Sequence, residues 1–161
     1  MNRVNRLLCE KSLPFQFATL FLFVMSPDGT GQYISAGHNP AYIFRAATGT
    51  IDKLSSEGYI LGMFDCASYQ PRDFRLAPKD LLVVYSDGLT DAENPREEMF
   101  GTARLLKIMR QESPNGGLVL EQKILQAIEE FTHGMPQTDD ITFLVVAKDV
   151  EMQNLPSGVQ I

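Results

Sequence analysis

The pattern of apolar and polar residues predicts mostly strands in the first half of the chain and mostly helices in the second. Residues 15–25, FQFATLFLFVM, are almost continuously aromatic or apolar, which is typical of a buried strand. The turn signal Pro27-Asp28-Gly29 follows this run and indicates a hairpin. The same criteria predict further strands at residues 31–35, 41–45, 50–54, 69–76, 81–85 and 141–147.

Helical periodicity occurs at the start of the chain and again beyond residue 100. Val4, Leu7 and Leu8 share one face at helical spacing, which predicts a helix near the N-terminus. The two later segments carry apolar residues every three or four positions, and we interpret these faces as core packing. The predicted helices cover residues 1–11, 101–111 and 118–132.

The order of these elements indicates an α+β domain. Several strands come first, two helices follow and one strand ends the series, unlike the alternating βαβ units of a parallel sheet. The helices are expected to cover one face of the antiparallel sheet. A length of 161 residues fits a single domain. We assign residues 1–149 to it and treat residues 150–161 as a loose tail.

The charge balance restricts the candidate partners. The chain has 20 acidic and 14 basic side chains, a net charge of -6, which argues against nucleic acid and anionic membranes as partners. Its longest apolar run, residues 18–25, is too short to span a bilayer, and the N-terminus has no signal-peptide pattern. Cys9 and Cys66 have neither metal-binding nor disulfide-framework spacing, so we expect a reducing cytoplasm.

Two acidic positions stand out because of their places next to strands. Asp87 follows the predicted strand at 81–85, and Asp139 precedes the predicted strand at 141–147. If these two strands are antiparallel neighbours, both carboxylates lie at the same edge of the sheet. Carboxylates that converge in this way suit Mg²⁺ or Mn²⁺, and Gly88 would allow a sharp turn beside the ion. A plain Asp-Gly turn and a solvated loop also fit these residues.

Several short motifs together resemble the SpoIIE-type branch of the PPM (protein phosphatase 2C-like) metal-dependent serine/threonine phosphatases. They occur in the family's order and span nearly the whole chain. The matching stretches are FATLF at 17–21, SAGHNP at 35–40, Leu61-Gly62, the run from Asp80 through YSDGLTDA at 85–92, and DDIT at 139–142.

The resemblance implies a β-sandwich flanked by helices with two Mn²⁺ or Mg²⁺ ions at one end. Asp87 and Asp139 match the family's metal-binding positions, whereas Asp140 and Thr142 look like residues that support the ligands. A metal-activated water would attack phosphoserine or phosphothreonine without a covalent phosphoenzyme. The implied substrate is a bacterial regulatory phosphoprotein, such as an anti-sigma-factor antagonist. The resemblance gives His38 no chemical role.

The chain departs from the family at its N-terminal end. No Asp-x-x-Gly-His-Gly motif, which supplies the aspartate that bridges both metals, occurs before Phe15. The first strands of the sandwich are therefore expected to be absent, and the chain alone is expected to be catalytically incomplete. A second hypothesis is an interaction module that forms homodimers through an exposed edge strand. A third is a cation-binding α+β domain unrelated to phosphatases.

Overall fold

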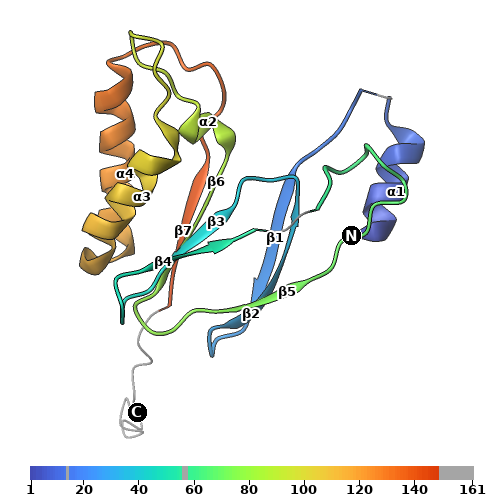
Figure 1. Cartoon of the computed structure of the whole chain (residues 1–161), viewed down its shortest axis with the longest axis horizontal. Helices are drawn as coiled ribbons and strands as arrows, with labels where there is room; N and C mark the ends of the chain where they lie inside the picture. The colour runs from blue at the N-terminus through green and yellow to red at the C-terminus, as the bar shows by residue number, and fades with distance from the viewer. Residues whose placement is uncertain (14, 56–57, 149–161) are drawn as a thin grey trace, which may run out of the picture.

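The computed structural model describes residues 1–13, 15–55 and 58–148, and the predicted tail lies outside them. Two antiparallel sheets form a sandwich, and two helices cover the outer face of one sheet (Figure 1). One sheet has the order β1-β2-β5 and the other the order β4-β3-β6-β7. The predicted α+β class with antiparallel strands and flanking helices is confirmed.

The strands are β1 (Leu20–Met25), β2 (Thr30–Ala36), β3 (Ala41–Phe44), β4 (Ile51–Leu54), β5 (Arg72–Arg75), β6 (Leu81–Tyr85) and β7 (Phe143–Ala147). The helices are α1 (Asn2–Lys11), α2 (Asp87–Thr90), α3 (Gly101–Glu112) and α4 (Gly117–Thr132), and a 3₁₀ turn at Ser113–Asn115 joins the last two. The predicted elements all occur with ends within three residues of the prediction, except that β1 begins five residues later. The α2 helix and the 3₁₀ turn were not predicted.

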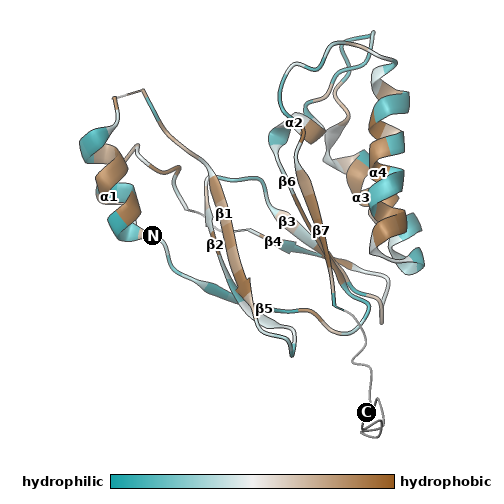
Figure 2. Ribbon diagram, turned by 180° about the vertical axis from the view of Figure 1, so that it is seen from behind, coloured by the Kyte–Doolittle hydropathy of each residue, from teal (hydrophilic) through white to brown (hydrophobic). Residues whose placement is uncertain are grey.

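Strand β6 is apolar throughout because both of its faces are covered. Leu82 packs in the core between the two sheets, and Val84 lies against that core. Leu81, Val83 and Tyr85 belong to a second core on the other face, under α3 and α4. Strand β7 pairs with β6 and is also apolar along most of its length (Figure 2). The central strand is thus held by packing from both sides, which fixes the direction in which its C-terminal end points.

The first predicted strand is shorter and less buried than expected. Residues 15–25 were interpreted as one buried strand, but β1 begins at Leu20, and the side chains of Phe15 and Phe17 are 74% and 60% exposed. Within β1 the burial alternates, because Phe21 and Phe23 face the inter-sheet core whereas Val24 faces outward. Before β1 the backbone pairs only at Ala18, in a bridge with Leu61, among the described residues.

The predicted helix α1 is present, and its one buried residue among those described is polar. Val4 and Leu7 are each 46% exposed, whereas Asn5 is fully buried. The Asn5 amide donates to the carbonyl oxygen of Phe64 at 2.8 Å, and its oxygen accepts from the Gly62 N–H at 2.9 Å. The Tyr69 hydroxyl also donates to that oxygen, at 3.3 Å. The buried Asn5 amide therefore joins α1 to the loop between β4 and β5, and Leu8 packs against the cluster that contains Leu61 and Tyr69.

No helix in the described part of the chain combines the length and apolarity needed to cross a bilayer.

Candidate metal centre

The C-terminal end of β6 and the segment leading into β7 lie side by side. The two strands are antiparallel, and Tyr85 pairs with Phe143 in the last step of their register. Continuing past this pair, the residues after Tyr85 run alongside those before Phe143. Asp87 and Asp139 therefore lie at the same edge of the sheet, as their positions on the predicted strands indicated.

The hydroxyl of Ser86 joins the end of β6 to the segment that leads into β7. It donates to the carbonyl oxygens of Asp140 and Thr142, at 3.0 and 3.3 Å, and accepts the N–H of Thr142 at 3.0 Å. The Ser86 N–H also donates to the Thr142 carbonyl, at 2.8 Å. Ser86 thus bonds to the segment that carries Asp139 through both its side chain and its backbone. The supporting contacts of Asp140 and Thr142 come from their backbones.

Gly88 allows the two segments to approach closely. A Cβ atom at this position would lie 2.4 Å from the carbonyl oxygen of Asp140 and 3.4 Å from the carbonyl carbon of Asp139. Real Cβ atoms do not come so near to backbone, so only glycine fits without a shift. The glycine expected to turn the chain beside an ion instead makes room for the neighbouring backbone.

Both carboxylates are exposed and oriented by local backbone. One oxygen of Asp87 accepts the Gly88 N–H at 3.1 Å, and one oxygen of Asp139 accepts the Asp140 N–H at 2.7 Å. Helix α2 starts at Asp87, so the carboxylate also sits at the positive end of this short turn. Exposed carboxylate oxygens held in place at one sheet edge are donors of the kind that Mg²⁺ and Mn²⁺ prefer.

Two carboxylates do not complete a metal centre. Among the residues that the structure describes, no group of three or more His, Cys, Asp or Glu side chains is placed to hold an ion. The residues present therefore fit part of a hard-cation site, and other oxygen ligands are needed to complete it.

The remaining sequence candidates lie elsewhere or have structural contacts. Asp28 sits in the β1–β2 turn, where its carboxylate accepts from the N–H and hydroxyl of Thr30, at 3.0 and 2.7 Å. His38 precedes β3, and its Nδ1 donates to the Asn39 carbonyl at 2.9 Å while its ring centroid lies 6.1 Å from that of Phe21. These contacts indicate that His38 has a structural role in the turn before β3.

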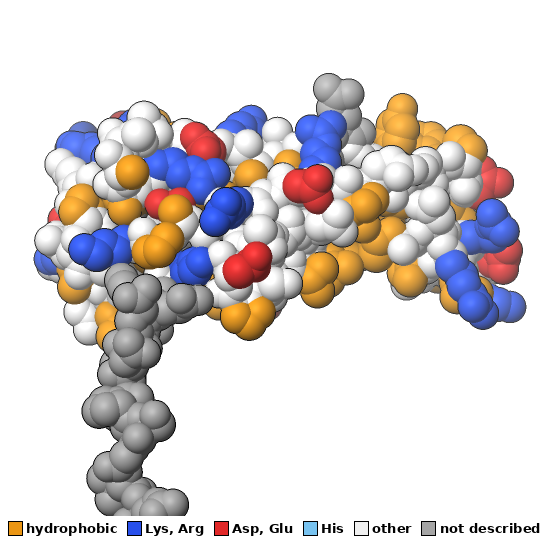
Figure 3. Space-filling model, turned by 90° about the horizontal axis from the view of Figure 1, so that it is seen from below, with side chains coloured by type: hydrophobic (Ala, Val, Ile, Leu, Met, Phe, Trp, Pro, Cys, Tyr) orange, Lys and Arg blue, Asp and Glu red, His pale blue; other side chains and the backbone are white. Residues whose placement is uncertain are grey.

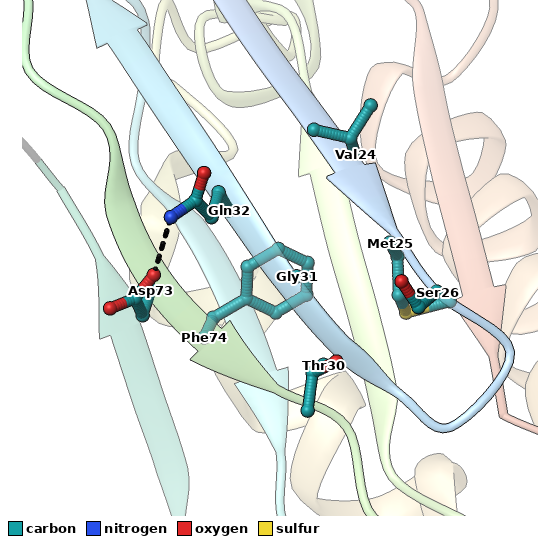
Figure 4. Close-up of a pocket in the computed structure, with 8 residues that line it drawn as sticks. All are labelled: Val24, Met25, Ser26, Thr30, Gly31, Gln32, Asp73 and Phe74. Atoms are coloured by element: carbon teal, nitrogen blue, oxygen red, sulfur yellow. Dashed lines mark hydrogen bonds between the residues drawn. The ribbon is translucent and has the colours of Figure 1, made fainter.

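A broad hollow on the sheet of β1, β2 and β5 offers little chemistry. It has a volume of about 690 Å³, and Figure 4 shows its lining residues. Its one carboxylate, Asp73, accepts a hydrogen bond of 2.8 Å from Gln32. The hollow lies near the β1–β2 turn, at the end of the strands away from Asp87. We assign it no role in the candidate centre.

Ser86 makes contacts at this edge that sequence reasoning did not predict. Its signal was present, because a serine directly before an aspartate at the end of a strand is a common N-cap of a following helix. Here the hydroxyl bonds across the sheet instead, to residues more than fifty positions away. Only the register of β6 and β7 reveals that partner.

Comparisons with known proteins agree on one family. The family model described as "Stage II sporulation protein E (SpoIIE)" matches residues 1–149. Protein IcfG of Synechocystis is 33% identical over 134 residues, which is 83% of this chain and 21% of IcfG. Phosphoserine phosphatase RsbU of Bacillus subtilis is 28% identical over 92 residues, which is 56% of this chain and 28% of RsbU. The chain thus spans less than a third of either relative.

Solved structures show the same fold. The phosphatase domain of SpoIIE from Bacillus subtilis superposes with a TM-score of 0.64 at 19% identity, covering 84% of this chain and 59% of that domain. The SiaA-PP2C domain of Pseudomonas aeruginosa superposes with a TM-score of 0.66 at 20% identity, covering 76% of this chain and 48% of that one. The chain therefore matches part of a PP2C-type phosphatase domain.

Proposed function

The chain belongs to the SpoIIE-type branch of the PPM phosphatases, and we propose that it supplies the Asp87 and Asp139 ligands of a centre that hydrolyses phosphoserine or phosphothreonine on a protein. The observation that carries this proposal is the Ser86 contact, which holds both carboxylates at one sheet edge. The domain that SpoIIE-type relatives share with it is a serine/threonine phosphatase domain.

Each residue has a distinct task in this proposal. Asp87 and Asp139 would bind the cations, and the Asp140 N–H holds one Asp139 oxygen in place. Two Mn²⁺ or Mg²⁺ ions, when bound, supply a water of lowered pKa and neutralise charge on the phosphoryl oxygens. Ser86 and Gly88 keep the two ligand-bearing segments together. The substrate class we propose is a phosphorylated bacterial regulatory protein, such as an anti-sigma-factor antagonist.

A phosphatase assay with Mn²⁺ on a phosphoserine peptide tests this proposal. The 161-residue chain is expected to turn over poorly, whereas a version extended upstream through a bridging aspartate is expected to be active. In the extended version, Asp87→Asn should lower activity by roughly 100-fold or more while folding survives, because losing a ligand costs at least as much as losing its supporting contacts. Asp28→Asn, in the distant hairpin turn, is the matched control.

Two outcomes would contradict the proposal. An extended protein that is indifferent to Asp87→Asn would refute the role of this carboxylate. Strong turnover by the 161-residue chain itself, lost on Asp87→Asn, would refute the view that this chain is catalytically incomplete.

A second candidate function is an interaction or dimerisation module. Strand β1 lies at the edge of its sheet as described, and the outward side chains of Leu22 and Val24 are 45% and 69% exposed. Hydrophobic side chains also gather over the half of the molecule that carries α1 and β1 (Figure 3). Such an edge favours pairing with another strand. Inactivity of the extended protein together with a dimer in sedimentation analysis would favour this function.

A further inference from the structure

A small hollow opens beside the candidate metal centre. It has a volume of about 170 Å³ and lies where the end of α4, the loop into β7 and the segment after α2 meet. Ile128 and Ala92 are almost fully buried in its wall, and Met135 is 45% exposed. Pro136 and Ile141 add further apolar lining, and the polar lining residues are Glu93, Thr132, Gln137, Thr138 and Asp139.

The hollow and the candidate centre share residues. Gly88 and Asp139 both line the hollow, and Gly88 lies directly against the backbone of Asp139 and Asp140. A phosphate group bound to cations held by Asp87 and Asp139 would therefore be next to the opening. An extended peptide advances about 3.3–3.6 Å per residue, so residues within three positions of the phosphorylated one can reach the hollow.

We propose that this hollow binds one apolar side chain of the phosphoprotein substrate, close in sequence to the phosphorylated serine or threonine. This inference rests on the proposed function. The size fits, since a dry apolar cavity of roughly 150 Å³ is large enough to hold benzene. The wall formed by Ala92, Ile128 and Met135 offers apolar contact, whereas Glu93 repels an acidic side chain. The substrate preference is therefore for a branched aliphatic or aromatic residue.

A leucine scan of phosphoserine peptides tests the inference. Leucine is placed in turn at the three positions on either side of phosphoserine in a Ser/Gly background, and kcat/KM is measured with Mn²⁺ on the upstream-extended protein. At one or two positions leucine should raise kcat/KM about tenfold, the order expected for filling an apolar pocket. Met135→Lys should reduce that preference to less than about twofold, because it places a charge in the wall.

Met63→Lys is the matched control. Met63 is a methionine of similar exposure, 51%, which lines the distant cleft beside α1, so its substitution should leave the tenfold preference intact. A flat leucine scan, or a preference that survives Met135→Lys, would overturn the inference while leaving the proposed function standing. Failure to hydrolyse both the peptides and p-nitrophenyl phosphate would instead contradict the proposed function.

A binding measurement tests whether the hollow binds an apolar side chain, even if the protein does not hydrolyse the peptide. With ¹³C-methyl methionine in the 161-residue chain and Mg²⁺ present, the leucine peptides should shift the Met135 methyl resonance and the leucine-free peptide should not. An unphosphorylated leucine peptide that binds equally well would overturn the assignment as a substrate subsite. A Met135 resonance in the extended protein that no peptide moves would show that the protein fills the hollow itself, which also overturns it.

Discussion

Replacing Gly88 with alanine should separate the two segments that form the candidate centre. The added Cβ atom would lie 2.4 Å from the Asp140 carbonyl oxygen and 3.0 Å from the carbon of the same group. These atoms belong to backbone held by the Ser86 hydroxyl, so no flexible side chain can move aside. The clash must be relieved by moving α2 away from the segment of Asp139.

The change in the free energy of unfolding for Gly88→Ala follows from two opposing effects. Overpacking of this kind costs about 1–3 kcal/mol, and contact with backbone favours the upper end of that range. Alanine in a helix is worth about 0.5–1 kcal/mol over glycine, and the lower value applies because α2 has only four residues. The free energy of unfolding should fall by about 2 kcal/mol, which lowers the Tm by roughly 4–8 °C for a domain of this size.

Gly117→Ala provides the matched control. Its Cβ atom would meet Val145 at 3.5 Å and Ala147 at 3.7 Å, which are ordinary contact distances, and Gly117 begins α4. This variant should be unchanged or more stable by up to about 1 kcal/mol. Urea denaturation of both variants and the parent chain, compared at equal m-value, measures the difference.

If Gly88→Ala matches the parent chain in its free energy of unfolding, the segment of Asp139 is not held against Gly88 as the structure places it. The same conclusion follows if the two alanine variants change stability equally, because a general effect of removing glycine would then account for both.

Two further predictions concern the framework of the sandwich. Asp80→Ala should cost about 1–3 kcal/mol in urea denaturation, because the 2% exposed carboxylate accepts from Arg45 at 2.8 Å and from the N–H groups of Ala46 and Ala77, which lose this partner. Asp52→Ala, which removes the 49% exposed partner of the same arginine, should cost less than about 1 kcal/mol; equal losses would contradict the assignment. Burial, assisted by the nearby Tyr42, raises the pKa of Tyr85 to about 12. The folded state therefore keeps the Tyr85 proton longer than the unfolded chain, whose tyrosine pKa is near 10. Stability should fall between pH 10 and about 12 in denaturant titrations, and less steeply for Tyr85→Phe.

Strand β6 shows which parts of the fold can be predicted from sequence. Its bounds follow from an apolar run of strand length between two turn signals, and the observed strand has the predicted ends. Residues 15–25 carry an even stronger apolar signal, yet Phe15 and Phe17 are exposed in the described structure. Hydrophobicity indicates that a segment prefers to be covered, but it does not identify the surface that covers it.

Buried polar contacts could not be predicted from the sequence for a related reason. Asn5 interrupts the predicted apolar face of α1, and nothing near it in sequence satisfies its amide. Its partners Phe64, Gly62 and Tyr69 lie 57 to 64 residues away. Periodicity describes one element at a time, so a polar side chain that joins two elements reads as exposed.

The candidate centre combines a predictable part with an unpredictable one. The approach of Asp87 and Asp139 follows from strand direction alone. The contact between Ser86 and Thr142 depends on the register of β6 and β7, and a slip of one residue would turn every side chain of β7 to the opposite face. Strand β7 is apolar on both faces, so its hydrophobic pattern does not identify the register from the sequence. The observed register places Ser86 opposite Thr142, and Ser86 then holds the segments that carry Asp87 and Asp139 together through contacts that require no ion.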